Sequence, residues 1–304
     1  MRRELSSVAV MAILIVAADI FALALAPILA AADVRAFPEP GSPTNVPVYI
    51  ALILVFTGVI LALIRLGRRN VVKWIILGSI FLTLLIVLSL GIFLALWPIA
   101  DDVLRGNIAL GAAVALSAFW VAALHRYPEW YTVDAAGLTI AVGVTAILGI
   151  SLTILNALIL LIALAVYDAW AVYRTRHMVA LADAVTSERL PVLLVVPKRR
   201  GYSYADQKSL REQLAHGEER EAMFMGLGDV IIPGILVVSA FAYTGELWIA
   251  IGTLIGTLIG FGVLMRFVLT GRPQAGLPFL NAGAILGYVV SYFAVFGTVG
   301  LGTP

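Results

Sequence analysis

Long apolar runs separated by short polar segments follow one another along almost the whole chain. A helix needs roughly 20 apolar residues to cross the ~30 Å hydrocarbon core of a bilayer. Lipid offers no hydrogen-bonding partner to a backbone polar group, so an apolar run of this length is predicted to be helical. The runs that meet the requirement directly are residues 6–31, 46–66, 71–98, 103–124, 224–243, 247–270 and 277–299.

A further apolar run, from Thr132 to Tyr173, is too long for one span. At 1.5 Å per residue it would extend about 63 Å, twice the thickness of the bilayer. Gly149, Ile150 and Ser151 near its middle form the natural break. We therefore predict an all-α, polytopic membrane protein with nine transmembrane helices in a single membrane domain. We divide this domain into three parts: residues 1–124 with helices 1–4, residues 125–223 with helices 5 and 6, and residues 224–304 with helices 7–9. The second part ends in a cytoplasmic loop at 174–223.

The composition agrees with a protein whose main solvent is membrane lipid. Of the 304 residues, 62% are hydrophobic and 12% are charged, whereas soluble domains are about half apolar and a quarter charged. The net charge of +2 is too small to indicate a nucleic-acid partner. The absence of cysteine excludes a disulfide, a thiol nucleophile and a Cys-ligated zinc. We expect a multi-pass protein of the cell membrane.

The distribution of Lys and Arg predicts the orientation. With nine spans, all of the 20 Lys and Arg residues except Arg35 and Arg105 fall on one side. Positive loops stay in the cytoplasm, so we expect a cytoplasmic N-terminus and an extracellular C-terminus. The one sizeable polar segment, 174–220, contains a β-branched run between two prolines, Leu190–Val196, which predicts a strand.

Two acidic residues lie at similar membrane depth on consecutive helices. Asp168 comes six residues before Arg174, the first cytoplasmic charge after the sixth span, and Asp229 comes eight residues after Glu221. These offsets correspond to about 9 and 12 Å along antiparallel helices. Ionisable groups at membrane depth are costly and usually functional. We therefore expect the two carboxyl groups to face each other.

Two facing carboxylates cannot both ionise cheaply, so one of them holds a proton. Such a pair supplies a base that activates water and an acid that assists the leaving group, as peptide hydrolysis requires. The neighbouring sequence suits this role: Gly226-Leu227-Gly228 allows close backbone approach before Asp229. Ala275-Gly276-Leu277-Pro278 begins the ninth span with Gly and Pro, whose unpaired backbone groups line a cavity when they lie at depth.

Two other acids receive structural interpretations. Asp19 in the first span is predicted to face a polar cavity or a neighbouring helix. Asp134 is predicted to mark the start of the fifth span, where a helix N-terminus favours a carboxylate.

Other functions are also open on these residues. An ion channel or transporter could use the same acids, and would lose flux rather than cleavage on Asp→Asn substitution. A zinc protease is disfavoured because His125, His177 and His216 lie in cytoplasmic segments and form no His-Glu-x-x-His. No membrane-embedded histidine is available to activate a serine. No metal or cofactor is expected.

Tyr167-Asp168, Gly226-Leu227-Gly228-Asp229 and Leu277-Pro278, in this order on spans six, seven and nine, resemble the presenilin and signal peptide peptidase family of intramembrane aspartyl proteases. The resemblance implies that Asp168 and Asp229 are the catalytic residues. The third motif of the family reads Pro-Ala-Leu, whereas Ala275 and Gly276 replace its first two residues here. Prepilin peptidases also use Gly-x-Gly-Asp, but they would not explain Tyr167-Asp168 or residues 275–278. The mixed character of the motifs fits an archaeal homologue.

The resemblance also implies a substrate: a membrane-spanning helix that must unwind before it is cut. The predicted strand is a candidate to pair with this unwound segment by strand addition. Its candidate substrate-binding residues are Leu190, Val192, Leu194 and Val196. The partners expected are therefore transmembrane-helix substrates and membrane lipid, and homo-oligomer formation is left open.

Overall fold

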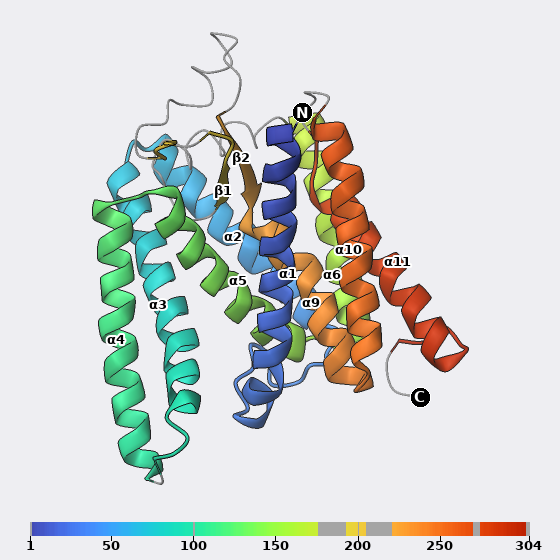
Figure 1. The fold of residues 1–304 in the computed structure, drawn as a ribbon, viewed down its shortest axis with the longest axis horizontal. Helices are drawn as coiled ribbons and strands as arrows, with labels where there is room; N and C mark the ends of the chain where they lie inside the picture. The colour runs from blue at the N-terminus through green and yellow to red at the C-terminus, as the bar shows by residue number, and fades with distance from the viewer. Residues whose placement is uncertain are drawn as a thin grey trace.

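The computed structural model describes residues 2–99, 101–175, 193–199, 201–204, 221–269 and 274–301. Within these ranges the chain folds into a bundle of long helices with a two-stranded hairpin at the end where the N-terminus lies (Figure 1). The helices are α1 (Arg2–Ala31), α2 (Asn45–Arg65), α3 (Arg69–Ala95), α4 (Asp102–Arg126), α5 (Trp130–Ser151), α6 (Ile154–Trp170), α9 (Leu227–Thr244), α10 (Leu247–Val268) and α11 (Leu277–Phe296).

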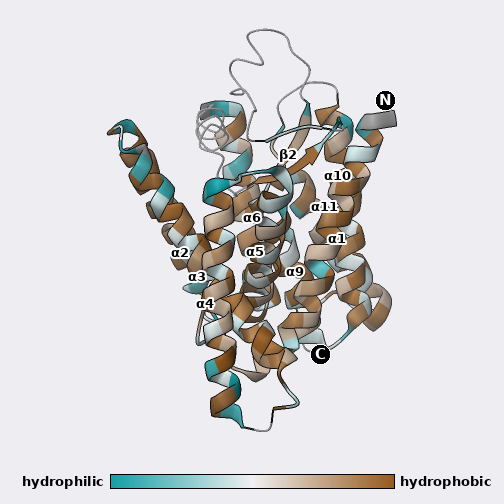
Figure 2. Cartoon of the chain, turned by 60° about the vertical axis from the view of Figure 1, so that its left-hand side comes forward, coloured by the Kyte–Doolittle hydropathy of each residue, from teal (hydrophilic) through white to brown (hydrophobic). Residues whose placement is uncertain are grey.

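The predicted number of spans is confirmed: in the described part of the chain, nine helices are long and apolar enough to cross a membrane. Apolar residues cover the outer surface of the bundle along most of its length (Figure 2). Helices α5 and α9 have the most buried faces and lie at the centre, with α1, α6 and α10 packed around α9. Helices α3 and α4 pack on each other at one side of the bundle (Figure 1).

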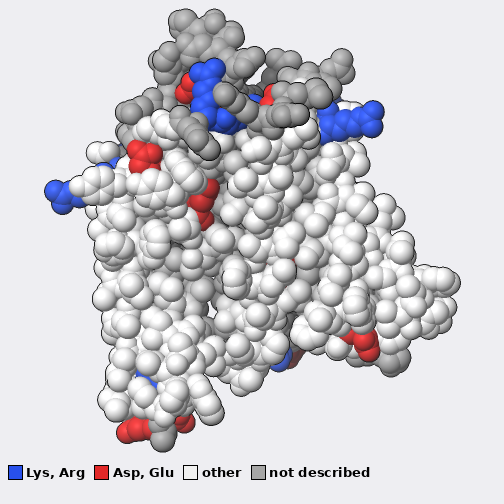
Figure 3. Space-filling view, in the orientation of Figure 1, with Lys and Arg blue, Asp and Glu red and all other residues white. Residues whose placement is uncertain are grey.

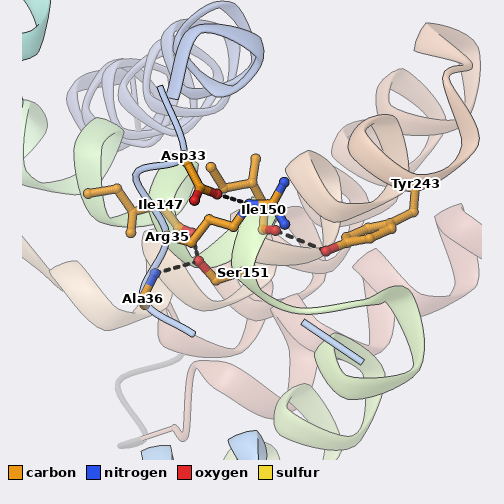
Figure 4. A network of polar contacts seen from close by, with 7 residues as sticks. All are labelled: Asp33, Arg35, Ala36, Ile147, Ile150, Ser151 and Tyr243. Atoms are coloured by element: carbon orange, nitrogen blue, oxygen red, sulfur yellow. Dashed lines mark hydrogen bonds and ion pairs between the residues drawn. The ribbon is translucent and has the colours of Figure 1, made fainter. Parts of the chain in front are cut away.

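The predicted break inside the long apolar run is also confirmed, since α5 ends at Ser151 and α6 begins at Ile154. The segment after α1 closes over this turn: the Ala36 N–H donates to Ser151 Oγ at 2.8 Å. From the other side, Tyr243 of α9 donates its hydroxyl hydrogen to the carbonyl oxygen of Ile150 at 2.9 Å. Figure 4 shows how these contacts converge on the turn. The bond from Tyr243 satisfies a carbonyl oxygen that the break would otherwise leave unpaired.

The hairpin consists of β1 (Leu193–Pro197) and β2 (Ala222–Gly226), which pair antiparallel with Leu193 opposite Gly226. The predicted strand is confirmed from Leu193 to Val196, and its earlier part, Leu190 and Val192, lies outside the described residues. The predicted start of the seventh span at residue 224 is wrong. Residues 222–226 form β2, and the helix begins only at Leu227, because pairing with β1 holds this apolar segment extended.

Candidate active site

Asp168 lies near the C-terminal end of α6, and it is buried, with 4% of its surface exposed. Its Oδ2 accepts a hydrogen bond from the backbone N–H of Leu277 at 3.1 Å, and the N–H of Gly276 also interacts with the carboxyl. Leu277 is the first residue of α11. The carboxyl of Asp168 therefore lies at the N-terminus of another helix, where negative charge is favoured.

Asp229 occupies the first turn of α9, and Gly226 is the N-cap of this helix. The carboxyl accepts a hydrogen bond from the backbone N–H of Gly226. An acid three residues after the N-cap that bonds back to the N-cap N–H forms half of a capping box. Gly226, the last residue of β2, thus fixes the position of the Asp229 carboxyl relative to the strand.

The backbone at Gly276 and Leu277 brings the two acids together. A β-carbon on Gly276 would lie 2.9 Å from Oδ2 of Asp229 and 3.0 Å from its Oδ1, so the Asp229 carboxyl packs directly on this glycine. The next residue, Leu277, donates its N–H to Asp168. The two carboxyl groups are close enough to interact electrostatically. The acids thus converge from α6 and α9 on one short segment, Gly276 and Leu277, at the start of α11.

This geometry has a clear electrostatic consequence. Two neighbouring carboxyl groups with little water around them hold one proton and one negative charge between them. The N-termini of α9 and α11 both point at the pair and stabilise that single charge. The pair therefore presents a base and an acid to a molecule that binds between them.

The remaining motif residues differ in what they contact. Ala275 is fully buried, and Pro278 occupies the first turn of α11, where its missing N–H costs no hydrogen bond. A β-carbon on Gly228 would meet nothing within 4 Å, so packing inside the described protein does not require a glycine there. Tyr167 is 39% exposed and points away from the buried side of α6 on which Asp168 lies.

Two of the four candidate substrate-binding residues can be placed. Leu194 and Val196 lie on β1, buried with 0% and 4% exposure, whereas Leu190 and Val192 lie outside the described residues. Two backbone groups of β1 that face away from β2 already have hydrogen-bond partners. Val195 donates its N–H to Asp134 at 2.7 Å, and the carbonyl oxygen of Pro197 accepts from Ser7 Oγ at 3.5 Å.

Asp134 is therefore more than the helix-start residue that the sequence suggested, because it holds β1 against α5. Asp19 is completely buried against α9, where Gly234 leaves room for it: a β-carbon there would lie 2.4 Å from Asp19 Oδ1. Neither carboxyl oxygen of Asp19 has a hydrogen-bond partner among the described residues. The interpretation of Asp19 as a residue facing a helix is confirmed, but it faces a glycine and not a polar partner.

Three parts of this site were not predicted: β2, Tyr173 and Gln274. Residues 222–226 were expected to be helical, although Gly226 at the end of an apolar run is a residue type that favours a helix N-cap. The side chains of Tyr173 and Gln274 bond to each other at 2.8 Å across 101 positions of sequence. No local pattern could have joined them. In the described part of the chain, no group of three His, Cys, Asp or Glu residues is placed to hold a metal.

Comparisons with known proteins agree on one family. The family described as signal-peptide peptidase, presenilin aspartyl protease matches residues 11–297. Two solved structures of a presenilin family intramembrane aspartate protease, in space groups C222 and P2, are each 34% identical to the chain. Both cover 93% of it, the matches span 97% and 96% of those proteins, and the TM-scores are 0.65 and 0.67.

No curated protein matches the chain. The family match nevertheless extends over nearly all nine spans, and it includes both acids and the segment 275–278 that contacts them. It favours a protease of the presenilin type over a channel, a transporter or a prepilin peptidase, which the residues alone left open. The chain belongs to the signal-peptide peptidase and presenilin family of aspartyl proteases, which cut transmembrane substrates inside the membrane.

Proposed function

We propose that Asp168 and Asp229 are the two catalytic residues of this intramembrane protease. The observation that carries the proposal is their convergence on one backbone segment: Leu277 donates its N–H to one acid, and Gly276 packs on the other. Two carboxyl groups held in this way by helix N-termini share one proton, which is the state that hydrolysis of a peptide bond needs.

The chemistry requires only these two groups and one water molecule. The ionised carboxylate takes a proton from the water while the water oxygen attacks the carbonyl carbon of the scissile peptide. The protonated carboxyl gives its proton to the carbonyl oxygen, and a tetrahedral diol forms. When the diol collapses, the C–N bond breaks and the leaving nitrogen takes a proton from the carboxyl that received one from water. The other carboxylate takes a proton from one hydroxyl of the diol, whose oxygen becomes the carbonyl oxygen of the new carboxylic acid. The pair then returns to its initial state with one proton.

Asparagine substitutions at the two positions test this assignment. Purified Asp168→Asn and Asp229→Asn proteins, incubated with single-span substrates and followed by mass spectrometry, are expected to lose cleavage by at least about 100-fold. Asp33→Asn is the matched control, because Asp33 has a 90% exposed side chain and lies far along the chain from both acids. The parent enzyme should show a bell-shaped pH profile. Cleavage that persists in either active-site variant, with a normal Tm, refutes the assignment.

We also propose that the unwound substrate adds as a strand to the outer edge of β2. The sequence had suggested residues of β1 for this pairing instead. Two groups of β1 that face away from β2, the Val195 N–H and the Pro197 carbonyl oxygen, already bond to Asp134 and Ser7. In an antiparallel ladder alternate residues point their N–H and C=O outward. Since Val195 points away from β2, its partner Phe224 must point away from β1. Among the described residues, no hydrogen bond engages the outer edge of β2 at Phe224.

The position of β2 supports this proposal, because the strand ends at Gly226 and Asp229 follows within one turn. A substrate strand paired there would lead into the space beside the acids. A proline scan of the substrate tests it. Strand addition uses every second N–H, so cleavage should fall at alternate substrate positions next to the cut. A scan without a period of two would exclude pairing of this kind.

We propose, finally, that the end of the bundle with the hairpin faces the cytoplasm. Lys and Arg gather mainly at that end, while the opposite end carries acidic residues and few basic ones (Figure 3). Because the chain has no cysteine, single cysteines at Ser203 and Asp102 can report the orientation. A membrane-impermeant maleimide added to intact cells should label only the second, and labelling of only the first would reverse the orientation.

A further inference from the structure

Helix α6 does not end as an ordinary α-helix after it has passed Asp168. It continues from Ala171 to Thr175 as a π-helical turn, η1. Such turns are rare and occur frequently at functional sites, because the wider turn changes the direction of the side chains that follow. Tyr173 lies in the middle of η1, and its hydroxyl donates a hydrogen bond to Oε1 of Gln274 at 2.8 Å.

Gln274 immediately precedes the segment that contacts both acids. Ala275 is fully buried, Gly276 packs on Asp229, and Leu277 donates to Asp168. The bond between Tyr173 and Gln274 therefore ties the element that carries Asp168 to the start of this segment.

A second bond ties the other end of the segment to the same helix. Asn281, one turn into α11, is buried and donates its side-chain N–H to the carbonyl oxygen of Leu161 in α6 at 2.8 Å. Gly276 and Leu277 thus lie between two side-chain hydrogen bonds, one on each side, and both bonds lead to α6 or its π-helical extension. The segment is fixed by contacts with α6 instead of by its own sequence.

Its own sequence provides little stiffness. A proline fixes φ near −65°, whereas Ala275 leaves that angle free, and Gly276 is the most flexible residue type. The Gly276 contact with Asp229 nevertheless tolerates little movement, since even one added carbon would lie within 3.0 Å of the carboxyl. Hydrogen bonds from outside the segment can supply the rigidity that its own sequence lacks.

We propose that Tyr173 and Gln274 are positioning residues whose hydrogen bond holds residues 275–277 against the two acids, in the place of a proline at position 275. This inference rests on the proposed catalytic role of Asp168 and Asp229. The hydrogen bond acts through the backbone N–H of Leu277 and through the packing of Gly276, and neither side chain takes part in the proton transfers.

Tyr173→Phe removes only the hydroxyl, and Gln274→Met removes the acceptor at similar length. Each change should lower kcat by about 2- to 12-fold, the value of one hydrogen bond, with KM unchanged. Tyr173 is 58% exposed, so the loss leaves no buried cavity and Tm should stay the same. The double variant should be no slower than the single ones, because both remove the same bond. Tyr127→Phe, at a 64% exposed tyrosine on the cytoplasmic end of α4, is the matched control.

The decisive variant adds Ala275→Pro to Tyr173→Phe. If the bond replaces a proline, this addition should restore kcat to within about 2-fold of the parent, whereas a general loss of structure would not be restored. Normal kcat in Tyr173→Phe, additive losses in the double variant, or no recovery with Ala275→Pro would each overturn the proposal. Failure of the catalytic assignment is distinct, because it would appear as cleavage by Asp168→Asn or Asp229→Asn.

Discussion

The close contact between α10 and α11 can be perturbed at a single atom by Gly256→Ala. A β-carbon on Gly256 would lie 2.2 Å from the carbonyl oxygen of Gly283 and 2.7 Å from the Cα of Gly287. Both atoms belong to the backbone of α11, so no side chain can rotate away. Optimum contact between carbon atoms needs about 3.5–4.0 Å. The two helices must therefore separate by roughly 1 Å, or the added methyl group must be accommodated under strain.

Such overpacking costs about 1–3 kcal/mol, which should lower Tm by roughly 3–10 °C. The displacement also affects chemistry, because α11 begins at Leu277, the residue that donates to Asp168. A misplacement of about 1 Å can reduce kcat by up to about 100-fold. Thermal denaturation in detergent and cleavage of a single-span substrate measure the two effects on the same preparation.

The matched control is Gly262→Ala on the same helix. A β-carbon on Gly262 would meet nothing within 4 Å, so alanine should fit without strain. Alanine is favoured over glycine in a helix by about 0.5–1 kcal/mol, and the control should keep or raise Tm with kcat unchanged. If Gly256→Ala behaves like this control in both measurements, the reasoning about the packing of α11 is wrong.

Two acids outside the proposed pair, the half-buried Asp134 and the fully buried Asp19, give opposite expectations. Asp134→Ala leaves the N–H of Val195 without its acceptor, which should cost about 1–3 kcal/mol of folding free energy and lower Tm. Because β1 would then be held less firmly, KM should rise. An unchanged KM would mean that the position of β1 does not affect substrate binding. Asp19→Asn replaces a carboxyl group that has no partner among the described residues by a neutral group of similar shape, so Tm should be unchanged or higher. A fall in Tm of more than about 5 °C, roughly 1–3 kcal/mol, would mean that the carboxylate of Asp19 has a stabilising partner.

Much of the architecture was predictable from local pattern alone. The lengths of the apolar runs determined the number of spans, since each run must satisfy its backbone groups as a helix in lipid. The same arithmetic located the break between α5 and α6 and placed Asp168 and Asp229 at one depth. These properties depend on residues that are close together in sequence.

Tertiary structure decided what depends on distant partners. Residues 222–226 are as apolar as a helix start, and only pairing with β1 makes them a strand that ends beside Asp229. The bond from Val195 to Asp134 likewise joins a strand to a helix that precedes it by 61 positions. The bond between Tyr173 and Gln274 joins residues 101 positions apart. Periodicity carries no information about such contacts, because packing and hydrogen bonds between separate elements select them only after the helices have assembled.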